Sequence, residues 1–407
     1  MPKVENILQQ IAVLEEKTGV KRTLLAVCPN STSVIKAAFR AAKRNNAPIM
    51  FAATLNQIDG DGGYTGLNQS EFVKMLCNEA ESVNYQGPYV VAIDHGGPWL
   101  KDIQSIEKWD TERAMSGVKK SYEDAISAGY DLIHVDPTVD IFLSKGQIID
   151  IKIVAARTVE LIVHAETFRR AHHIASISYE VGTEEVHGGL ADESVFDIFI
   201  SELKKGLDKA GLNEVWPCFI VGKVGTDLHT TTFDKEVACK LTTKVRKFGS
   251  YIKGHYTDGV SNPQDYPLCG MGAANVGPEF TISEYEALIE LEQIEKEYNL
   301  KNEIAQLSNI KTTLWKLVIE SNRWRKWLHE GEKDFQDLSE ERKSWIIKTC
   351  CRYIWQNPEA LVARYRLYDN LKRFGIDSES VLLGRIEHDM DKYFYAFNLV
   401  NLNDHLV

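Results

Sequence analysis

The sequence predicts an α/β protein, a TIM-type (β/α)8 barrel with a C-terminal helical extension. About eight short apolar runs alternate with helical stretches, and strands in such an alternation pair in parallel through crossover helices. Eight strand–helix units close into a barrel rather than an open sheet. The first strand–helix turn also lacks the GxGxxG phosphate loop of an open, doubly wound sheet.

The elements follow in chain order. Residues 1–22 contain an amphipathic helix, because apolar side chains recur there at helical spacing. Strands are predicted within 23–31, 48–57, 88–99, 130–138, 175–189, 217–229, 250–262 and 270–281, where apolar runs end in turn formers. Helices are predicted between them, over 34–46, 70–83, 111–128, 149–172, 196–210, 235–249 and 284–298.

Three parts result: an N-terminal helix (1–22), the barrel (23–299) and a helical C-terminal region (300–407). Helices rich in aromatic and basic residues are predicted in the last part, over 315–330, 342–356 and 360–375. Aromatic residues at helical spacing favour a cap that packs its tryptophans against the barrel. The alternative is a binding surface for an anionic sugar phosphate or a partner. The tryptophans concerned are Trp315, Trp324, Trp327, Trp345 and Trp355.

Composition excludes several classes of protein. The formal net charge of −11 argues against a nucleic-acid partner. No segment has the ~18 uninterrupted apolar residues of a membrane span, and the N-terminus resembles neither a signal nor a transit peptide, so we expect a cytoplasmic protein. Seven cysteines, an odd number with no CxxC motif, argue against a disulfide framework and a structural zinc cluster.

The most informative stretch is PYVVAIDHGGPW (88–99). Its apolar run ends abruptly in Asp94 and His95, which places two ionisable side chains at the C-terminal end of a barrel strand. Barrel enzymes gather their catalytic residues at that end. A metal ligand beside a proton-transfer group is one interpretation of the pair. The other is that Asp94 starts a turn and His95 is a partly buried filler.

Three histidines, His95, His229 and His255, come at the C-terminal ends of three different predicted strands. Those ends form one ring in a barrel, so the three imidazoles can converge on a divalent ion with an open position, able to polarise a carbonyl. Asp94 would then transfer protons, and Glu180 or Glu184 would add negative charge. We expect His134, delivered with Asp136 by the fourth strand, to be a neighbour of the ring, and His187 stays unassigned.

Several segments then resemble a known family. NQIDGDGGYTG (56–66), DHGGPW (94–99), IHVD (133–136), SYEVGTEEVHGG (178–189) and NVGPEFT (275–281) are similar to signatures of class II metal-dependent ketose-bisphosphate aldolases. They are more similar to the tagatose-bisphosphate aldolase subunit family called non-catalytic (GatZ/KbaZ). The resemblance runs from about residue 23 to 300 and, more weakly, to the end of the chain.

The resemblance implies a divalent ion, zinc or else manganese, cobalt or nickel, held by His95, His229 and His255. It also implies that Asp94 is the acid/base residue and that Asn275 holds the substrate. Other substrate-binding candidates are Asn56, Gln57 and Asp136. Class II aldolases hold a phosphate with glycine-rich segments after two of the histidines, but this chain has HTTT (229–232) and HYTDG (255–259) there.

The expected function is therefore metal-dependent retro-aldol and aldol chemistry on a ketose or ketose phosphate, with 4-epimerisation of the tagatose/fructose type as the first expectation. Tagatose-1,6-bisphosphate aldolase activity, or a non-catalytic subunit that stabilises an aldolase, is the alternative. The expected assembly is a homo-oligomer or a hetero-complex with a catalytic aldolase subunit.

Overall fold

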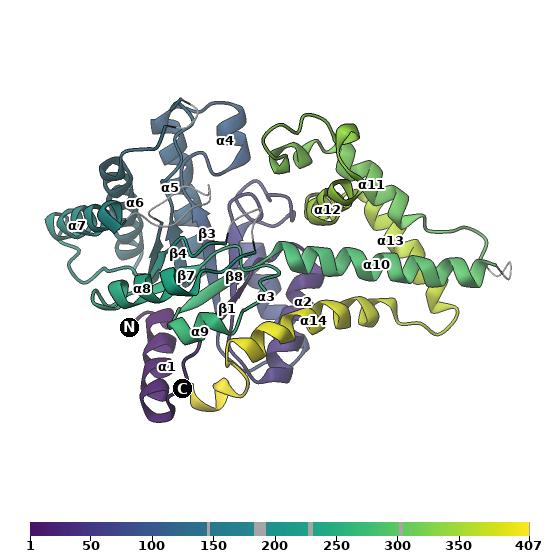
Figure 1. The fold of residues 1–407 in the computed structure, drawn as a ribbon, viewed down its shortest axis with the longest axis horizontal. Helices are drawn as coiled ribbons and strands as arrows, with labels where there is room; N and C mark the ends of the chain where they lie inside the picture. The colour runs from purple at the N-terminus through teal and green to yellow at the C-terminus, as the bar shows by residue number, and fades with distance from the viewer. Residues whose placement is uncertain (145–146, 183–192, 227–230, 301–303, 407) are drawn as a thin grey trace.

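In the computed structural model, which describes residues 1–144, 147–182, 193–226, 231–300 and 304–406, eight parallel strands form a closed barrel in the order β1 to β8 (Figure 1). Leu24 to Val27 of the first strand pair with Ala273 to Val276 of the last and close it. The predicted fold class is confirmed. The strands are β1 (Leu24–Val27), β2 (Ile49–Thr54), β3 (Tyr89–Gly96), β4 (Leu132–Val135), β5 (Ser178–Val181), β6 (Phe219–Val221), β7 (Tyr251–Gly254) and β8 (Ala273–Val276).

The helices of the barrel lie outside this sheet, and polar side chains fix where many of them begin. Ser31 accepts the N–H of Val34 at the start of α2, and Asn68 and Glu71 form a capping box at the start of α3. The helices are α1 (Lys3–Thr18), α2 (Thr32–Asn45), α3 (Gln69–Ser82), α4 (Asp102–Ile106), α5 (Thr111–Ala128), α6 (Ile151–Ala171), α7 (Glu193–Lys209), α8 (Lys235–Arg246), α9 (Asp265–Cys269) and α10 (Pro278–Asn299).

The C-terminal region extends the molecule to one side. The long helix α10 runs away from the barrel, and α14 runs back beside it to α2 (Figure 1). Between them come α11 (Ile310–Glu320), α12 (Glu340–Cys350) and α13 (Pro358–Lys372), and α14 covers Ser378–Ala396. Short 3₁₀ turns cover Arg323–Trp327, Phe335–Asp337, Cys351–Tyr353 and Leu402–His405.

The predicted helix over 315–330 is wrong in its second half. Helix α11 ends at Glu320, and Asn322 has a left-handed backbone conformation (φ 53°), which interrupts the helix before the 3₁₀ turn. The turn buries Trp324 and Trp327, and Trp355 is buried as well. Much of the tryptophan surface is therefore packed inside the protein.

A buried carboxylate connects the C-terminal region with the barrel. Glu284 on α10 accepts hydrogen bonds from Ser31 Oγ at 2.6 Å and from Arg364 Nη2 on α13 at 2.5 Å. The Glu284 side chain is fully buried, so three helices meet at one charged group. Loss of either partner would leave that charge poorly compensated.

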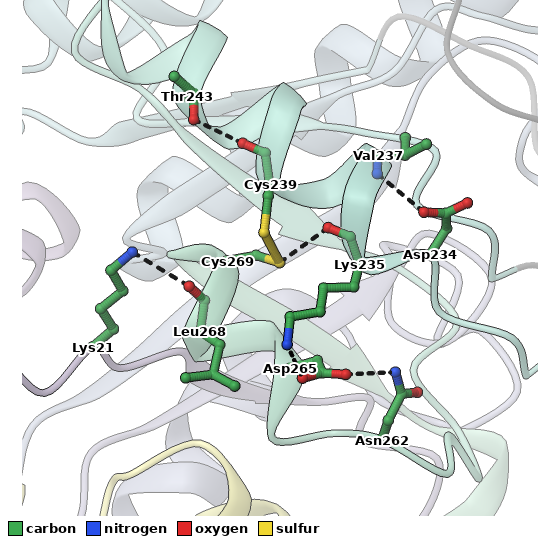
Figure 2. The surroundings of a disulfide bond; sticks show 10 residues. All are labelled: Lys21, Asp234, Lys235, Val237, Cys239, Thr243, Asn262, Asp265, Leu268 and Cys269. Atoms are coloured by element: carbon green, nitrogen blue, oxygen red, sulfur yellow. Dashed lines mark hydrogen bonds and ion pairs between the residues drawn. A yellow bond between two sulfur atoms is a disulfide. The ribbon is translucent and has the colours of Figure 1, made fainter.

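One disulfide corrects the expectation drawn from the cysteine count. Cys239 on α8 and Cys269 on α9 are bonded, although 30 residues separate them (Figure 2). The two helices pack together, and an ion pair between Lys235 and Asp265 (2.8 Å) holds them at the same place. No spacing in the sequence indicates this pair, because the tertiary packing of α8 against α9 creates it. Cys28, Cys77, Cys218, Cys350 and Cys351 are free thiols.

None of the described helices combines the length and the apolar character that crossing a membrane requires.

Candidate functional site

Ionisable side chains from four strands meet at the C-terminal mouth of the barrel. Asp94 and His95 end β3, His134 lies on β4, Glu180 on β5, and His255 directly follows β7. The register aligns His134 with Glu180 on neighbouring strands. All but His95 are buried, and His95 is largely enclosed. The convergence expected for Asp94, His95 and His255 is present.

The backbone of β3 explains the sequence Asp-His-Gly-Gly. The pairing of β3 with β4 shifts register between Ile93 and Gly96, and His95 there has a φ of 50°, a conformation that side chains other than glycine seldom adopt. A Cβ on Gly97 would lie 1.8 Å from the Asp136 carbonyl oxygen, so no other residue fits. The irregularity turns the His95 side chain into the site, and such outliers are typical of functional positions.

His95 and His255 are arranged as a pair of metal ligands would be. His95 Nε2 and His255 Nδ1 lie 3.0 Å apart. Two nitrogens bound to one tetrahedral zinc ion lie about 3.3 Å apart. The other nitrogen of each ring faces a carboxylate: His95 Nδ1 lies 2.6 Å from Asp136 and His255 Nε2 lies 2.9 Å from Glu180. Carboxylates behind metal-binding imidazoles fix the tautomer and the ring orientation in this way.

The sequence suggested that His134 is only a neighbour of the site. In the structure it lies at the centre of the site. His134 belongs to two groups of side chains whose potential ligand atoms all lie within 4.8 Å of one another. One group contains His95 and His255, and the other contains Asp94, Glu180 and His255. Its Nδ1 accepts the backbone N–H of His95 at 3.1 Å and lies 3.5 Å from Asp94 Oδ1. Among the described residues its Nε2 has no hydrogen-bond partner. With Nδ1 accepting, a neutral His134 carries its proton on Nε2, so the lone pairs and negative charge that could hold a cation here come mainly from His95, His255, Asp94 and Glu180.

The charges of the ion-free site follow the same geometry. Burial by itself would lower the pKa of His95, but Asp94 and a hydrogen bond to Asp136 raise it to about 9. Burial lowers the pKa of His255 to about 4, against the attraction of Asp94 and Glu180. A cation that bound to this group of side chains would compete with the His95 proton.

Asp94 is a buried carboxylate that stays ionised. Its Oδ1 accepts a hydrogen bond from Asn275 Nδ2 at 3.0 Å and lies 3.9 Å from the Lys253 ammonium. Burial would raise the pKa of Asp94, but the charges of His95 and His255 and, more weakly, of Lys253 hold it well below its usual range. An ionised carboxylate at hydrogen-bonding distance from a fixed amide is a suitable proton acceptor.

Lys253 was not singled out by the sequence analysis. It lies on β7 two residues before His255, and residues two apart share one face of a strand, so this position could have been found. Its fully buried ammonium donates to Glu180 Oε2 at 2.7 Å. Burial would raise the pKa of Glu180, but Lys253 and His134, with a hydrogen bond from His255, lower it to about 2. Glu180 thus orients His255 and compensates Lys253.

A cavity of about 390 Å³ lies over these residues. Asp94, His95, His255 and Asn275 line it, and so do the expected substrate-binding residues Asn56 and Gln57. Both amides are already engaged: Asn56 Nδ2 donates to the Leu100 carbonyl at 2.8 Å, and Gln57 Oε1 accepts the Thr54 N–H at 2.7 Å. These two side chains therefore shape the wall of the cavity.

Asp136, the other expected substrate ligand, lies behind His95 with 2% of its surface exposed, and Thr138 donates to it at 2.6 Å. Glu180 is likewise fully buried. His229 and Glu184, and with them His187, lie outside the described residues.

The C-terminal region forms part of the cavity wall, which its sequence pattern did not reveal. Lys326, Trp327, Arg352 and Tyr353 line it opposite residues of the barrel loops. These side chains come from two 3₁₀ turns and not from the faces of long helices. Its buried tryptophans agree with a cap, and the binding-surface interpretation stays a prediction, although basic residues of the region line a ligand-sized space.

Comparisons with known proteins agree with the barrel fold. The family model described as "D-tagatose-1,6-bisphosphate aldolase subunit GatZ/KbaZ-like" matches residues 8–386. The crystal structure of a probable tagatose 6 phosphate kinase from Sinorhizobium meliloti 1021 is similar, with a TM-score of 0.77 at 20% identity over 92% of this chain and 100% of that one. A fructose-bisphosphate aldolase from Campylobacter jejuni has a TM-score of 0.55 at 13% identity, covering 98% and 95% of the two chains. At these identities the two structures support the fold alone.

Proposed function

Because the chain belongs to the D-tagatose-1,6-bisphosphate aldolase subunit GatZ/KbaZ-like family, we propose that it carries out divalent-metal-dependent retro-aldol and aldol chemistry on a ketose or ketose phosphate. Within that chemistry we propose 4-epimerisation as the reaction. The observation that carries the proposal is Asp94, a buried, ionised carboxylate on the cavity wall beside two imidazoles backed by carboxylates.

His95 and His255 would hold the cation, with His229 as the proposed third ligand and His134 as the alternative. The ion, zinc or else manganese, cobalt or nickel, would supply the positive charge that draws electrons toward a ketose carbonyl. The acceptor-rich arrangement of imidazoles and carboxylates in the site supports this assignment.

Asp94 would accept the proton of the C4 hydroxyl while the C3–C4 bond opens and its electron pair moves toward the C2 carbonyl. Asn275 holds the Asp94 carboxylate in place through a 3.0 Å hydrogen bond. The aldehyde fragment would then present its other face, the bond would form again, and Asp94 would return the proton to the new C4 oxygen. Tyr256 lines the same cavity, and burial raises the pKa of its hydroxyl, so it stays a neutral donor.

Two features favour epimerisation over release of the fragments. Residues of the C-terminal region form part of the cavity wall, and their contacts would help to retain an aldehyde formed inside it for re-addition. In addition, Asp258 Oδ1 accepts the N–H groups of Gly277 and Glu279 at 2.8 Å each, at the N-terminus of α10. Backbone N–H groups at a helix N-terminus could bind a phosphate, but Asp258 already accepts both of them. A second phosphate would therefore have no donors there, which argues against a bisphosphate substrate.

A non-catalytic subunit is the second candidate, and the word "subunit" in the family description favours it. In that case the protein would stabilise a separate aldolase.

One assay distinguishes the candidates. The purified protein alone is incubated with fructose, tagatose and their 6-phosphates, with and without added divalent metal. Interconversion of C4 epimers with little free triose is the expected result. Stoichiometric triose release would indicate an aldolase. No turnover until an aldolase chain is added would indicate the accessory subunit.

A further inference from the structure

Arg352 is a buried cation on the cavity wall without a carboxylate partner. It is 7% exposed and lies in the 3₁₀ turn after α12, in the C-terminal region. Its guanidinium lies 4.4 Å from the Trp327 ring and 5.0 Å from the Tyr353 ring, which fix its position. Within the described part of the chain it forms one hydrogen bond, to Tyr353 Oη at 3.1 Å, and no ion pair.

The acidic residues on the same wall all have partners of their own. Asp102 pairs with Arg323 at 2.6 Å and with Lys326 at 3.3 Å. Asp258 accepts two backbone N–H groups, and Asp94 faces the imidazoles. Arg352 lies near enough to Asp258 to lower its pKa, but no described carboxylate forms an ion pair with the guanidinium, so its donors can still bind a ligand carboxylate or phosphate.

Two neutral donors accompany Arg352. Tyr353 Oη accepts from Arg352 and from Trp327 Nε1 at 3.2 Å, so its own proton is free to be donated. Asn30, 3% exposed, accepts Gln57 Nε2 at 2.8 Å and Tyr64 Oη at 2.9 Å on its oxygen, which fixes the amide orientation. Its Nδ2 has no partner among the described residues, and Asn30 lines the cavity.

These donors belong to one wall, because the Tyr64 and Tyr353 rings pack edge to face at 5.1 Å. The wall thus presents a guanidinium, a hydroxyl and an amide to the cavity that Asp94, His95 and His255 also line. Three donors of which one is a fixed cation match the three terminal oxygens of a phosphate monoester.

We propose that Arg352, Tyr353 and Asn30 form a subsite for the terminal phosphate of a ketose 6-phosphate, bound with its carbonyl end toward His95 and His255. The subsite rests on the proposed function for the identity of the sugar, but its affinity for a phosphate monoester can be measured without turnover. It makes the C-terminal region part of the substrate site, because two of the three donors come from it.

The test measures binding of tagatose, tagatose 6-phosphate and inorganic phosphate by calorimetry, for the full chain and for Arg352→Gln, Tyr353→Phe and Arg373→Gln. Arg373 is the matched control, an exposed arginine of the same region that pairs with Asp369 on its own helix. We expect Arg352→Gln to weaken tagatose 6-phosphate binding about 30-fold or more, as removal of one partner of a buried charge pair does. Tagatose binding should change by less than about threefold, since the guanidinium contacts only the phosphate.

Tyr353→Phe retains the aromatic ring and so guards against misfolding of the arginine variant, but it removes the acceptor of Arg352 and Trp327 together with the donated hydroxyl. It should weaken phosphate binding by about fivefold, the effect of one neutral hydrogen bond. Equal losses for tagatose and tagatose 6-phosphate in Arg352→Gln would overturn the subsite, as would an equal loss in Arg373→Gln. A preference for a ketose bearing a terminal carboxylate would overturn the assignment to phosphate. If phosphate-selective binding persists without turnover, the subsite stands and the proposed reaction fails.

Discussion

Replacement of Lys253 by methionine tests whether the buried ion pair with Glu180 organises the site. Both side chains are fully buried and their charged atoms lie 2.7 Å apart. Removal of one partner from a buried pair costs about 3–5 kcal/mol, because the remaining charge is left uncompensated. The pKa of Glu180, about 2 against an ordinary 4.5, corresponds to a net stabilisation of about 3 kcal/mol after the cost of burial, and Lys253 is the largest of the partners that lower it.

The pH dependence has a definite sign. A carboxyl group whose pKa is lowered in the folded protein contributes stability above its unfolded pKa and loses it as the pH falls through the folded value. The stability difference between the parent protein and Lys253→Met should therefore stay constant from pH 8 to pH 5 and shrink as the pH falls from about 4.5 towards 2. The pKa of Lys253 is raised by Glu180 and Asp94 despite burial, so its charge persists throughout this range.

Urea denaturation of the metal-free protein provides the measurement, and an exposed pair provides the control. Lys240 and Glu236 also lie 2.7 Å apart, but on the surface of α8. Lys240→Met should cost less than about 0.5 kcal/mol. Lys253→Met combined with Glu180→Gln should recover part of the loss. A cost below about 1 kcal/mol for Lys253→Met, or no recovery in the double variant, would refute this account.

Three further predictions concern the site and the C-terminal region. Asp94→Asn should lower turnover by about 10²-fold or more and leave metal content unchanged, because it removes a proton acceptor and not a ligand; elemental analysis beside the epimerase assay checks both. His229→Ala should lose most of the bound metal, and stoichiometric metal in that variant together with loss in His134→Ala would move the third ligand to His134. A chain ending near Leu300 should aggregate or melt at lower temperature than the full protein, since apolar barrel surface under α14 would be exposed; equal solubility and heat stability would contradict this.

The sequence was sufficient for the barrel because strand and helix periodicities are local, and the motif at Asp94 and His95 marks a strand end by composition alone. The role of His134 could not be assigned, because its contact with the His95 backbone depends on the register shift in β3. Lys253 was overlooked because a lysine within an apolar strand suggests an edge or an end rather than a buried pair.

The part of the cavity wall that the C-terminal region contributes was even harder to predict from the sequence. Arg352 and Tyr353 line the cavity from a 3₁₀ turn that follows α12. A turn this short has no hydrophobic periodicity from which the direction of its side chains could be predicted. The same holds for the bond between Cys239 and Cys269, which depends on how two helices pack and not on any spacing.

The position of α14 also determines when the barrel can finish folding during synthesis. This last helix packs on α2, and the chain after it hydrogen-bonds to the barrel: Asn401 N–H to the Asn45 carbonyl at 2.8 Å, and Thr23 N–H to the Phe397 carbonyl at 3.2 Å. Contacts between residues so far apart in the sequence are strongly non-local, and such contacts slow folding. A nascent chain therefore leaves the face of α2 that packs on α14 uncovered until residues 378–396 have emerged, and a chain lacking them would expose an aggregation-prone surface.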